Sequence, residues 1–267
     1  MNPDVRIARS FLFVPGDRPD RFAKAATSGA DAVVLDLEDA VGTDDKARAR
    51  EHVRHWLEQG NQAVVRINGS GTPHYDADVD MVAEHADTVM LPKAEHAGHV
   101  TTLAAALPAT TGIIPLLETA TGIVQAVDVC RASTVLRPAF GSVDLATQLG
   151  IDHRCSDALY QARSSIVLAA ASAERGAPIE GVTTTIDDPA ALRADTERVK
   201  SLGFTAKLCI HPRQVATVNE TFLPSATETE WARRVLDAAH DGAAAAVDGQ
   251  MVDRPVLLRA EAIIART

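Results

Sequence analysis

The sequence predicts an α/β protein: a (β/α)8 barrel, or TIM barrel, followed by a C-terminal helical extension. Eight short apolar runs alternate with helix-like segments, which is the pattern of an eight-stranded parallel barrel. A chain of 267 residues with 46% hydrophobic residues can bury one core of that size. No glycine-rich GxGxxG or GxxxxGKS/T loop favours an open nucleotide-binding sheet instead. We expect a barrel domain over residues 1–225 and a helical extension over residues 226–267.

The first apolar run, Ser10–Gly16, has the length of a buried strand, and its Pro-Gly end leads into a helix that opens near Asp17. That helix carries three cations, Arg18, Arg21 and Lys24. Two interpretations are open: the cations bind phosphate groups beside the turn, or they form the solvated face of the helix. The solvated face is the commoner arrangement.

The second run, Asp31–Asp39, ends in three acids, Asp36, Glu38 and Asp39. Like charges gathered at a strand end require a cation, hydrogen bonds or a raised pKa. Glu38 and Asp39 are therefore candidate site residues. The alternative is a capped loop that faces water.

The third and fourth runs, Ala63–Asn68 and Thr88–Lys93, each carry one cation. Arg66 lies inside a strand pattern, where an unpaired charge is unfavourable. Its planar guanidinium suits either a substrate carboxylate or the acids of the second run, and both interpretations stay open. For Lys93 we expect an exposed lysine rather than a Schiff-base lysine, because the latter requires desolvation and a lowered pKa.

The fifth and sixth runs, Gly112–Thr119 and Val135–Asp144, each deliver one carboxylate at the end of an apolar stretch. These acids are Glu118 and Asp144. Ligands of parallel α/β folds bind at the carboxyl ends of the strands, and hard oxygen donors there suit Mg²⁺ or Mn²⁺. The pair is a candidate metal site. The alternative is that each acid is a helix N-cap or lies in a first helical turn.

The remaining segments complete the eight-fold pattern and then depart from it. We expect His211, at the end of the eighth run, to have a structural role. The expected helices include 45–58, 120–130, 157–175 and 187–202, the last two strands lie within 179–186 and 203–212, and an alanine- and glycine-rich connector at 242–246 separates C-terminal helices at 228–240 and 256–265.

Charge and composition exclude several classes of function. The net charge of −10 argues against nucleic acid or an anionic membrane as the main partner. No secretory or membrane-spanning stretch is evident, so we expect a cytoplasmic protein. Cys130, Cys155 and Cys209 are too few and too scattered for a disulfide framework, and we expect all three in or near the core. No Ser-His-Asp set or HExxH spacing supports a hydrolase of those kinds.

With these residues in hand, the chain resembles the citrate lyase beta subunit family within the HpcH/HpaI aldolase superfamily, nearly from end to end. The segments that carry the resemblance are Phe11-Leu-Phe-Val-Pro-Gly16, Val34-Leu-Asp-Leu-Glu-Asp39, Val65-Arg-Ile-Asn68, Met90-Leu-Pro-Lys93, Leu117-Glu-Thr119, Phe140-Gly-Ser-Val-Asp144, Ile210-His-Pro212 and Gly249-Gln-Met-Val-Asp253. The family pattern Phe-Gly-Ala-Glu-Asp stands here as Phe140-Gly-Ser-Val-Asp144, so no role of its extra acid carries over.

The resemblance implies a site in which Glu118 and Asp144 hold Mg²⁺, with Mn²⁺ as a substitute, and Arg66 grips a 2-oxo acid carboxylate. It also implies a homotrimer or hexamer, in which Asp253 reaches an adjacent subunit for acid-base work. We add Glu38 and Asp39 to the expected catalytic residues. The expected substrate-binding residues are Phe13, Arg18, Lys24, Arg66 and Glu118.

The expected activity is cleavage of a short 3-hydroxyacyl-CoA thioester, such as (S)-citramalyl-CoA or malyl-CoA, into acetyl-CoA and pyruvate or glyoxylate. Three alternatives stay open: a citryl thioester lyase, a hydroxyacyl-CoA thioester hydrolase on the same scaffold, and a non-catalytic binding subunit. The chain is short beside typical malyl-CoA lyases, which favours citramalyl-CoA.

Overall fold

The computed structural model describes residues 4–240 and 246–266. Within it the chain forms two compact units, Met1–Asn219 and Glu220–Thr267. The first unit contains a closed barrel of eight parallel strands, each hydrogen-bonded to the strands before and after it in sequence, with β1 also pairing β8. The strands are β1 (Ser10–Pro15), β2 (Ala32–Asp36), β3 (Val64–Arg66), β4 (Thr88–Leu91), β5 (Gly112–Leu117), β6 (Ala139–Phe140), β7 (Ile179–Glu180) and β8 (Ala206–Cys209).

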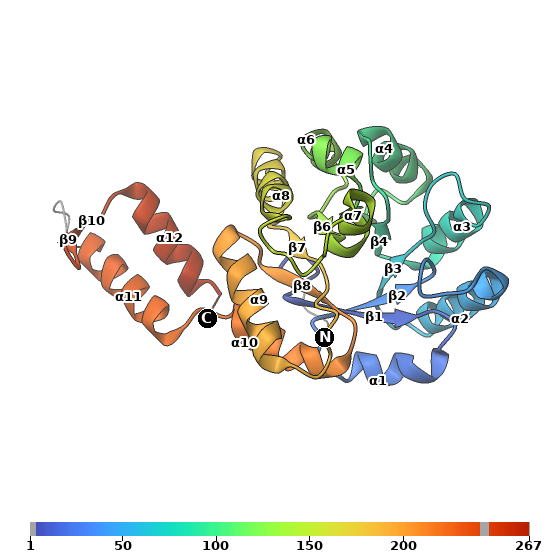
Figure 1. The fold of residues 1–267 in the computed structure, drawn as a ribbon, viewed down its shortest axis with the longest axis horizontal. Helices are drawn as coiled ribbons and strands as arrows, with labels where there is room; N and C mark the ends of the chain where they lie inside the picture. Colours follow the sequence, from blue (N-terminus) through green and yellow to red (C-terminus); the bar gives the residue numbers. More distant parts are fainter. Residues whose placement is uncertain (1–3, 241–245, 267) are drawn as a thin grey trace. The chain divides into compact units, whose positions relative to one another are not determined.

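Helices surround this barrel, and Figure 1 shows α2, α3, α4, α6 and α8 in succession around its outside. The predicted (β/α)8 fold is therefore confirmed. The helical elements of this part of the chain are η1 (Pro19–Arg21), α1 (Phe22–Ala26), η2 (Thr43–Asp45), α2 (Lys46–Glu58), α3 (Tyr75–His85), α4 (Ala97–Ala106), α5 (Ala120–Val124), α6 (Ala126–Arg131), α7 (Ser142–Leu149), α8 (Tyr160–Ser172), α9 (Pro189–Leu202) and α10 (Pro212–Phe222).

The strands form because they are short, apolar and buried on both faces. Phe11, Val34, Val64 and Met90 belong to one hydrophobic cluster, and each of these four residues is at least 99% buried. Each such side chain stabilises the fold by roughly 1.5–3 kcal/mol relative to exposure. The strand register places Arg66 directly beside Asp36 on the neighbouring strand, so the register that buries the core also fixes two charged residues at the barrel mouth.

Several predicted boundaries differ from the observed ones. The sixth and seventh strands have only two residues each. The helix expected at 120–130 is two helices, α5 and α6, because Gln125 adopts a non-helical conformation between them. A single non-helical residue hardly changes the apolar pattern, so the sequence pattern predicts one continuous helix. The helix expected at 157–175 is shorter, Tyr160–Ser172.

The expectation that all three cysteines lie in or near the core is wrong for one of them. Cys130 and Cys209 are buried, whereas Cys155 is exposed. Cys155 lies in the turn segment before α8, where its side chain faces water. Residue type alone does not distinguish a core cysteine from one in a loop.

The C-terminal unit is the predicted helical extension. Its helices α11 (Ala226–His240) and α12 (Arg254–Ile264) pack through a core of Ala232, Val235, Ala260 and Ile263. A small antiparallel hairpin, β9 (Ala246–Val247) and β10 (Gln250–Met251), lies between them in sequence. Most of the alanine- and glycine-rich connector falls at 241–245, outside the described residues. The domain boundary after residue 225 and the packing of the extension on another subunit stay predictions.

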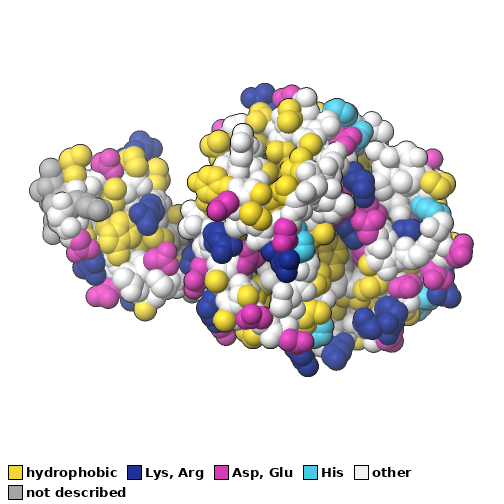
Figure 2. Space-filling model, viewed as in Figure 1, with side chains coloured by type: hydrophobic (Ala, Val, Ile, Leu, Met, Phe, Trp, Pro, Cys, Tyr) yellow, Lys and Arg dark blue, Asp and Glu magenta, His cyan; other side chains and the backbone are white. Residues whose placement is uncertain are grey.

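Two further observations bear on the classes of function. Across residues 4–240 and 246–266, every helix is too short or too polar to cross a membrane. On the face shown in Figure 2, acidic and basic side chains are interspersed instead of forming one basic patch.

Candidate active site

The candidate site is a cavity of about 330 Å³ at the carboxyl ends of the barrel strands. Five of the residues expected at the site line it together: Phe13, Asp39, Arg66, Glu118 and Asp144. The cavity wall also contains the apolar side chains Leu116, Phe140, Val182, Leu208 and Ile210. Few polar groups in a mostly apolar, concave setting are typical of a small-molecule site.

Arg66 is held by Asp36, the last residue of β2, and by Glu38 in the loop that follows it. Its Nε and Nη2 donate hydrogen bonds of 2.7 and 2.6 Å to the two carboxylate oxygens of Asp36, and its Nη1 lies 3.0 Å from Glu38 Oε2. Burial opposes the guanidinium charge, but the neighbouring carboxylates of Asp36 and Glu38 raise the pKa of Arg66. The guanidinium also lies over the Phe13 ring, 4.8 Å from its centroid. The ion pair with the strand-two acids is thus present, and it leaves guanidinium N–H groups free to face the cavity.

Asp36 organises the loop that carries the other acids. It accepts main-chain hydrogen bonds from Glu38 at 2.8 Å and Ala40 at 3.1 Å. From the other side, the Lys46 ammonium donates to the carbonyl oxygens of Leu37 and Glu38 at 2.7 and 2.6 Å. These bonds fix the loop after β2 from two directions, although Lys46 is buried and its burial lowers its pKa.

Glu38 is a buried acid between two cations. Its Oε1 accepts a hydrogen bond from the Lys93 ammonium, and its Oε2 faces Arg66. Burial nevertheless raises the pKa of Glu38. Asp39, by contrast, is largely exposed at the rim, 3.9 Å from Lys93 Nζ. The predicted acidic cluster is therefore real, but cations already partner its buried members.

Glu118 follows β5 and is almost completely buried. Burial, together with the charges of Glu38 and Asp144, raises its pKa to about 8. Its Oε1 accepts a hydrogen bond of 2.9 Å from the main-chain N–H of Lys93. The alternative role of helix cap is wrong for Glu118, because Thr119 is the N-cap of α5 and its hydroxyl accepts from the Gly122 N–H at 3.1 Å.

Gly141 makes room for the Glu118 side chain. A Cβ atom at position 141 would lie 2.3 Å from Glu118 Cβ and 2.6 Å from Glu118 Oε2. Three residues later, Asp144 stands in the first turn of α7 and lines the same cavity. Only glycine at this turn lets the two carboxylates share one cavity wall.

The donor set fits a hard divalent cation. Two carboxylates line one cavity, and the burial of Glu118 and its repulsion from Asp144 are conditions that a bound cation relieves. Among the described residues no group of three His, Cys, Asp or Glu side chains forms a closed metal cage. A cation between Glu118 and Asp144 would therefore take its other ligands from water and substrate, as Mg²⁺ commonly does.

A second cavity, of about 380 Å³, adjoins the first at the acidic cluster. Glu38, Asp39 and Lys93 line it, together with the polar side chains Lys46, Asn68, Ser70, Thr72, Glu95 and His99. Lys93 and Lys46 are the site residues that sequence reasoning missed. The signal available was the surplus of acids at the end of the second run, which requires cations nearby.

The other predicted residues lie outside these two cavity linings. Arg18 pairs with Asp20 at 3.0 Å, and Lys24 is exposed on α1. His211 accepts a hydrogen bond from the Arg213 N–H at 3.2 Å, in keeping with its expected structural role. Asp253 belongs to the C-terminal unit and is the N-cap of α12, where its Oδ1 accepts from the Val256 N–H at 3.2 Å.

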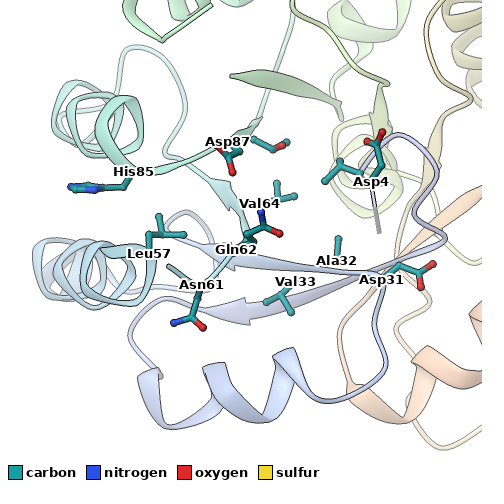
Figure 3. A pocket seen from close by; sticks show the side chains of 13 residues that line it. Asp4, Asp31, Ala32, Val33, Leu57, Asn61, Gln62, Val64, His85 and Asp87 are labelled. Atoms are coloured by element: carbon teal, nitrogen blue, oxygen red, sulfur yellow. The ribbon is translucent and has the colours of Figure 1, made fainter. Parts of the chain in front are cut away.

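A further cavity, of about 230 Å³, lies at the opposite, amino-terminal ends of the strands (Figure 3). Asp31, His85 and Asp87 line it. Asp31 is bound by Arg9 at 2.9 Å, and His85 lies 3.8 Å from Glu58. Features on this face of a barrel generally serve stability, whereas active sites lie on the opposite face.

Comparison with known proteins identifies the family. The model of the HpcH/HpaI aldolase/citrate lyase family matches residues 9–212. This chain belongs to that family. The chain is 40% identical over 264 residues to a citrate lyase subunit beta-like protein of Mycobacterium tuberculosis, covering 96% of this chain and 94% of the relative.

Other members of the HpcH/HpaI aldolase/citrate lyase family are similar over nearly the whole chain. A (3S)-malyl-CoA thioesterase of Cereibacter sphaeroides is 34% identical over 274 residues, covering 96% of each protein. The crystal structure of CitE from M. tuberculosis in complex with magnesium, acetoacetate and coenzyme A has a TM-score of 0.86 and 38% identity, covering 98% of this chain and 99% of that one. The names in this family thus include both lyase subunits and a thioesterase.

Proposed function

We propose that this protein is a Mg²⁺-dependent carbon–carbon lyase that cleaves a short 3-hydroxyacyl-CoA thioester, such as (S)-citramalyl-CoA or malyl-CoA. The products are acetyl-CoA and a 2-oxo acid, pyruvate or glyoxylate. The observation that carries the proposal is the shared cavity of Glu118, Asp144 and Arg66. The complex of a similar protein with magnesium, acetoacetate and coenzyme A supports the same ligand classes.

The reaction breaks the bond between the hydroxyl-bearing carbon and the carbon next to the thioester. The hydroxyl proton leaves, its oxygen becomes the carbonyl of the 2-oxo acid, and the bonding electrons form a thioester enolate that takes up a proton. A divalent cation held by Glu118 and Asp144 supplies positive charge beside the reacting oxygen when it is bound. Mn²⁺ has the same preference for oxygen ligands and is expected to substitute.

The chain's own residues orient the substrate. Arg66, fixed by Asp36 through two of its N–H groups, has others to bind the substrate carboxylate. The Phe13 ring covers one face of the guanidinium. It excludes water there, which strengthens the contact between Arg66 and the substrate carboxylate. We propose that Asp39, which lines both cavities, and Glu38, which lines the adjoining one, exchange a proton with the substrate hydroxyl, directly or through water.

Two groups away from the cavity complete the proposal. Arg18 and Lys24 bind the phosphate groups of CoA near the first βα turn. Asp253 protonates the enolate carbon from a neighbouring subunit of a homotrimer or hexamer. We also propose a cytoplasmic location.

A panel of short 3-hydroxyacyl-CoA thioesters tests the proposal. Purified protein is incubated with each thioester and Mg²⁺, and 2-oxo acid formation is followed with lactate dehydrogenase and NADH. We expect oxo acid from at least one substrate with the wild type and a large loss of rate with Asp144→Asn, which keeps the side-chain size. Absence of oxo acid from every thioester of the panel would defeat the lyase proposal.

A second candidate function is hydrolysis of the thioester. The similarity to a (3S)-malyl-CoA thioesterase favours it. A hydrolase releases free CoA and an intact hydroxy acid, whereas a lyase releases acetyl-CoA, which has no free thiol. A thiol reagent added to the same reaction therefore separates the two. Similarity to a citrate lyase subunit beta of Leuconostoc mesenteroides keeps citryl thioesters on the panel.

A further inference from the structure

Lys93 occupies an unusual position between the acids of the candidate site. It follows β4, and its backbone adopts the left-handed conformation, with φ of 49°. Residues other than glycine rarely adopt this backbone conformation, and those that do cluster at functional sites. The only other non-glycine residues with positive φ within the described part of the chain are Glu174 and Asp248, which do not line either cavity.

In this conformation two consecutive main-chain N–H groups point at the end of β5. The Lys93 N–H donates to Glu118 Oε1 at 2.9 Å, and the Ala94 N–H donates to the Leu116 carbonyl at 3.2 Å. One carboxylate oxygen of Glu118 is therefore engaged. The other, Oε2, is the oxygen that faces Gly141.

The ammonium of Lys93 makes contacts that are separate from those of its main-chain N–H. It forms a hydrogen-bonded ion pair with Glu38 and lies 3.9 Å from Glu118 Oε1. Arg66 faces the other oxygen of Glu38. Both oxygens of Glu38 thus face cations, which compete with any metal for this carboxylate.

We propose that Lys93 is a positioning residue that determines which carboxylates bind the cation. Its N–H fixes Glu118 so that one oxygen remains for the metal, and its ammonium keeps Glu38 out of the coordination shell. The inference rests on the proposed cation between Glu118 and Asp144 and names the residue that limits the site to those two ligands.

Limiting the protein ligands to two has a chemical consequence. A site with two carboxylates leaves most coordination positions to water and substrate, which suits Mg²⁺. A third carboxylate from Glu38 would add negative charge and an extra oxygen ligand, which favours the larger Ca²⁺. Without the Lys93 ammonium, we therefore expect tighter cation binding, a shift towards Ca²⁺, and fewer positions open to substrate.

Calorimetric titration of the metal-free protein with Mg²⁺, Mn²⁺ and Ca²⁺, at one fixed pH, tests the role of the ammonium. Lys93→Met removes the charge and keeps the length. Because a like charge near the site is lost, we expect its Kd for Ca²⁺ to fall by about tenfold and the preference for Mg²⁺ over Ca²⁺ to decrease. Lys93→Arg keeps the charge and is expected to stay within about threefold of the wild type.

Lys200→Met is the matched control, because it removes the same charge from α9, which contributes no side chain to either cavity. We expect its metal affinities to equal those of the wild type. If Lys93→Met fails to fold by circular dichroism, Lys93→Gln replaces it. A Kd for Ca²⁺ in Lys93→Met that is unchanged or higher than in the wild type overturns the proposal.

A second pair of variants tests the main-chain hydrogen bond. Lys93→Gly accepts the left-handed conformation without strain, whereas Lys93→Val does not. Both remove the ammonium, so they differ in the placement of the N–H that holds Glu118. We expect the valine variant to bind Mn²⁺ about tenfold more weakly than the glycine variant, the usual loss when an outer-shell partner of a ligand is displaced. Equal affinities would show that the N–H does not position Glu118.

These titrations also separate this inference from the proposed function. A wild-type protein that binds none of the three cations would defeat the proposed metal site itself. A wild-type protein that binds Mg²⁺, with Lys93→Met behaving identically, would defeat only the role of Lys93.

Discussion

Arg66 and Asp36 lie side by side on β3 and β2 and are joined by two parallel hydrogen bonds of 2.7 and 2.6 Å. Their side chains are only 11% and 1% exposed. Removing one partner of a buried ion pair strongly destabilises the fold, because the other charge then stays buried without compensation. The pair therefore links the stability of the barrel to the residue proposed to bind substrate.

Arg66→Ala should lower both stability and substrate binding. The unfolding free energy, measured by urea denaturation, should fall by about 3–5 kcal/mol, because Asp36 loses its partner. The Arg131→Ala variant is the matched control. It breaks a 3.5 Å surface pair with Asp128 whose side chains are about 60% exposed, and it should cost less than about 1 kcal/mol. Equal losses in the two variants would contradict the structural role of Arg66.

Arg66→Lys separates charge from geometry. Lysine keeps the positive charge but cannot form the two parallel bonds that the guanidinium makes. In the condensation direction we expect the KM for the 2-oxo acid to rise more than kcat falls, because ground-state binding of the carboxylate is weakened. An unchanged KM would show that Arg66 serves only as the partner of Asp36.

From the raised pKa of Glu118 we expect a distinctive dependence of stability on pH in the metal-free protein. Burial raises its pKa to about 8 in the folded chain, against an ordinary glutamate pKa of 4.5, so between these values the folded state holds a proton that the unfolded state has released. Stability should therefore fall as pH rises through that window, by at most about 1.4 kcal/mol per pH unit from this group. Glu118→Gln keeps the size and cannot ionise, so its decline should be shallower.

Urea denaturation in the presence of EDTA, at several pH values between 5 and 8, measures this difference. The comparison of the two proteins cancels the other titrating groups, which both contain. Parallel stability curves would mean that Glu118 does not hold a proton in the folded state, and its proposed environment would be wrong.

Gly141→Ala should displace Glu118. The added methyl group would lie 2.3 Å from Glu118 Cβ, so a side chain or the backbone must shift, at a cost of about 1–3 kcal/mol. Metal affinity should fall as well, because Glu118 moves away from Asp144. Gly98→Ala is the control, since a methyl group on Gly98 has no atom within 4 Å. Retention of wild-type Mn²⁺ affinity by Gly141→Ala would contradict the close approach.

Asp253 combines a structural contact with a proposed catalytic role, and two substitutions separate them. Asp253→Asn keeps an oxygen for the Val256 N–H and should preserve stability while lowering kcat by roughly a hundredfold or more, the scale for loss of a general acid. Asp253→Ala should lose about 1 kcal/mol of stability as well. Normal turnover in Asp253→Asn would leave Asp253 as a helix cap only.

Mixed oligomers test whether Asp253 acts across subunits. Inactive Asp253→Asn and Arg66→Ala chains are combined under conditions of proven subunit exchange. A shared site should recover part of the activity, because some sites then contain both wild-type residues. If the mixture is as inactive as each variant alone, Asp253 acts in the site of its own chain or has no role in the reaction.

Much of the barrel and part of the site followed from the sequence. Buried parallel strands are short apolar runs, so their number and order were readable, and acids at strand ends were expected to meet at one mouth. Glu118 and Asp144 do line one cavity. For Arg66 the sequence leaves two partners open, a substrate carboxylate and the acids of the second run. The residue that faces Arg66 depends on the strand register, and in the structure this residue is Asp36.

Lys93 illustrates what the sequence did not reveal. Its pattern is that of an exposed lysine at a strand end, and its side chain is indeed 46% exposed. Its contacts with Glu38 and Glu118 depend on a left-handed backbone and on the approach of strands that are distant in sequence. Neither is encoded in periodicity or composition. The same limit applies to Lys46, whose helix pattern does not show that its ammonium turns inward.

The most direct test of the account follows the products of citramalyl-CoA carrying ¹³C in its acyl group. Purified protein, Mg²⁺ and the labelled thioester are combined, and the carbon spectrum is recorded over time, with an EDTA-treated sample in parallel. We expect pyruvate and acetyl-CoA in equal amounts, and no reaction after EDTA until Mg²⁺ is restored. Labelled citramalate with free CoA, or turnover that EDTA does not affect, would contradict the central claim of metal-dependent carbon–carbon cleavage.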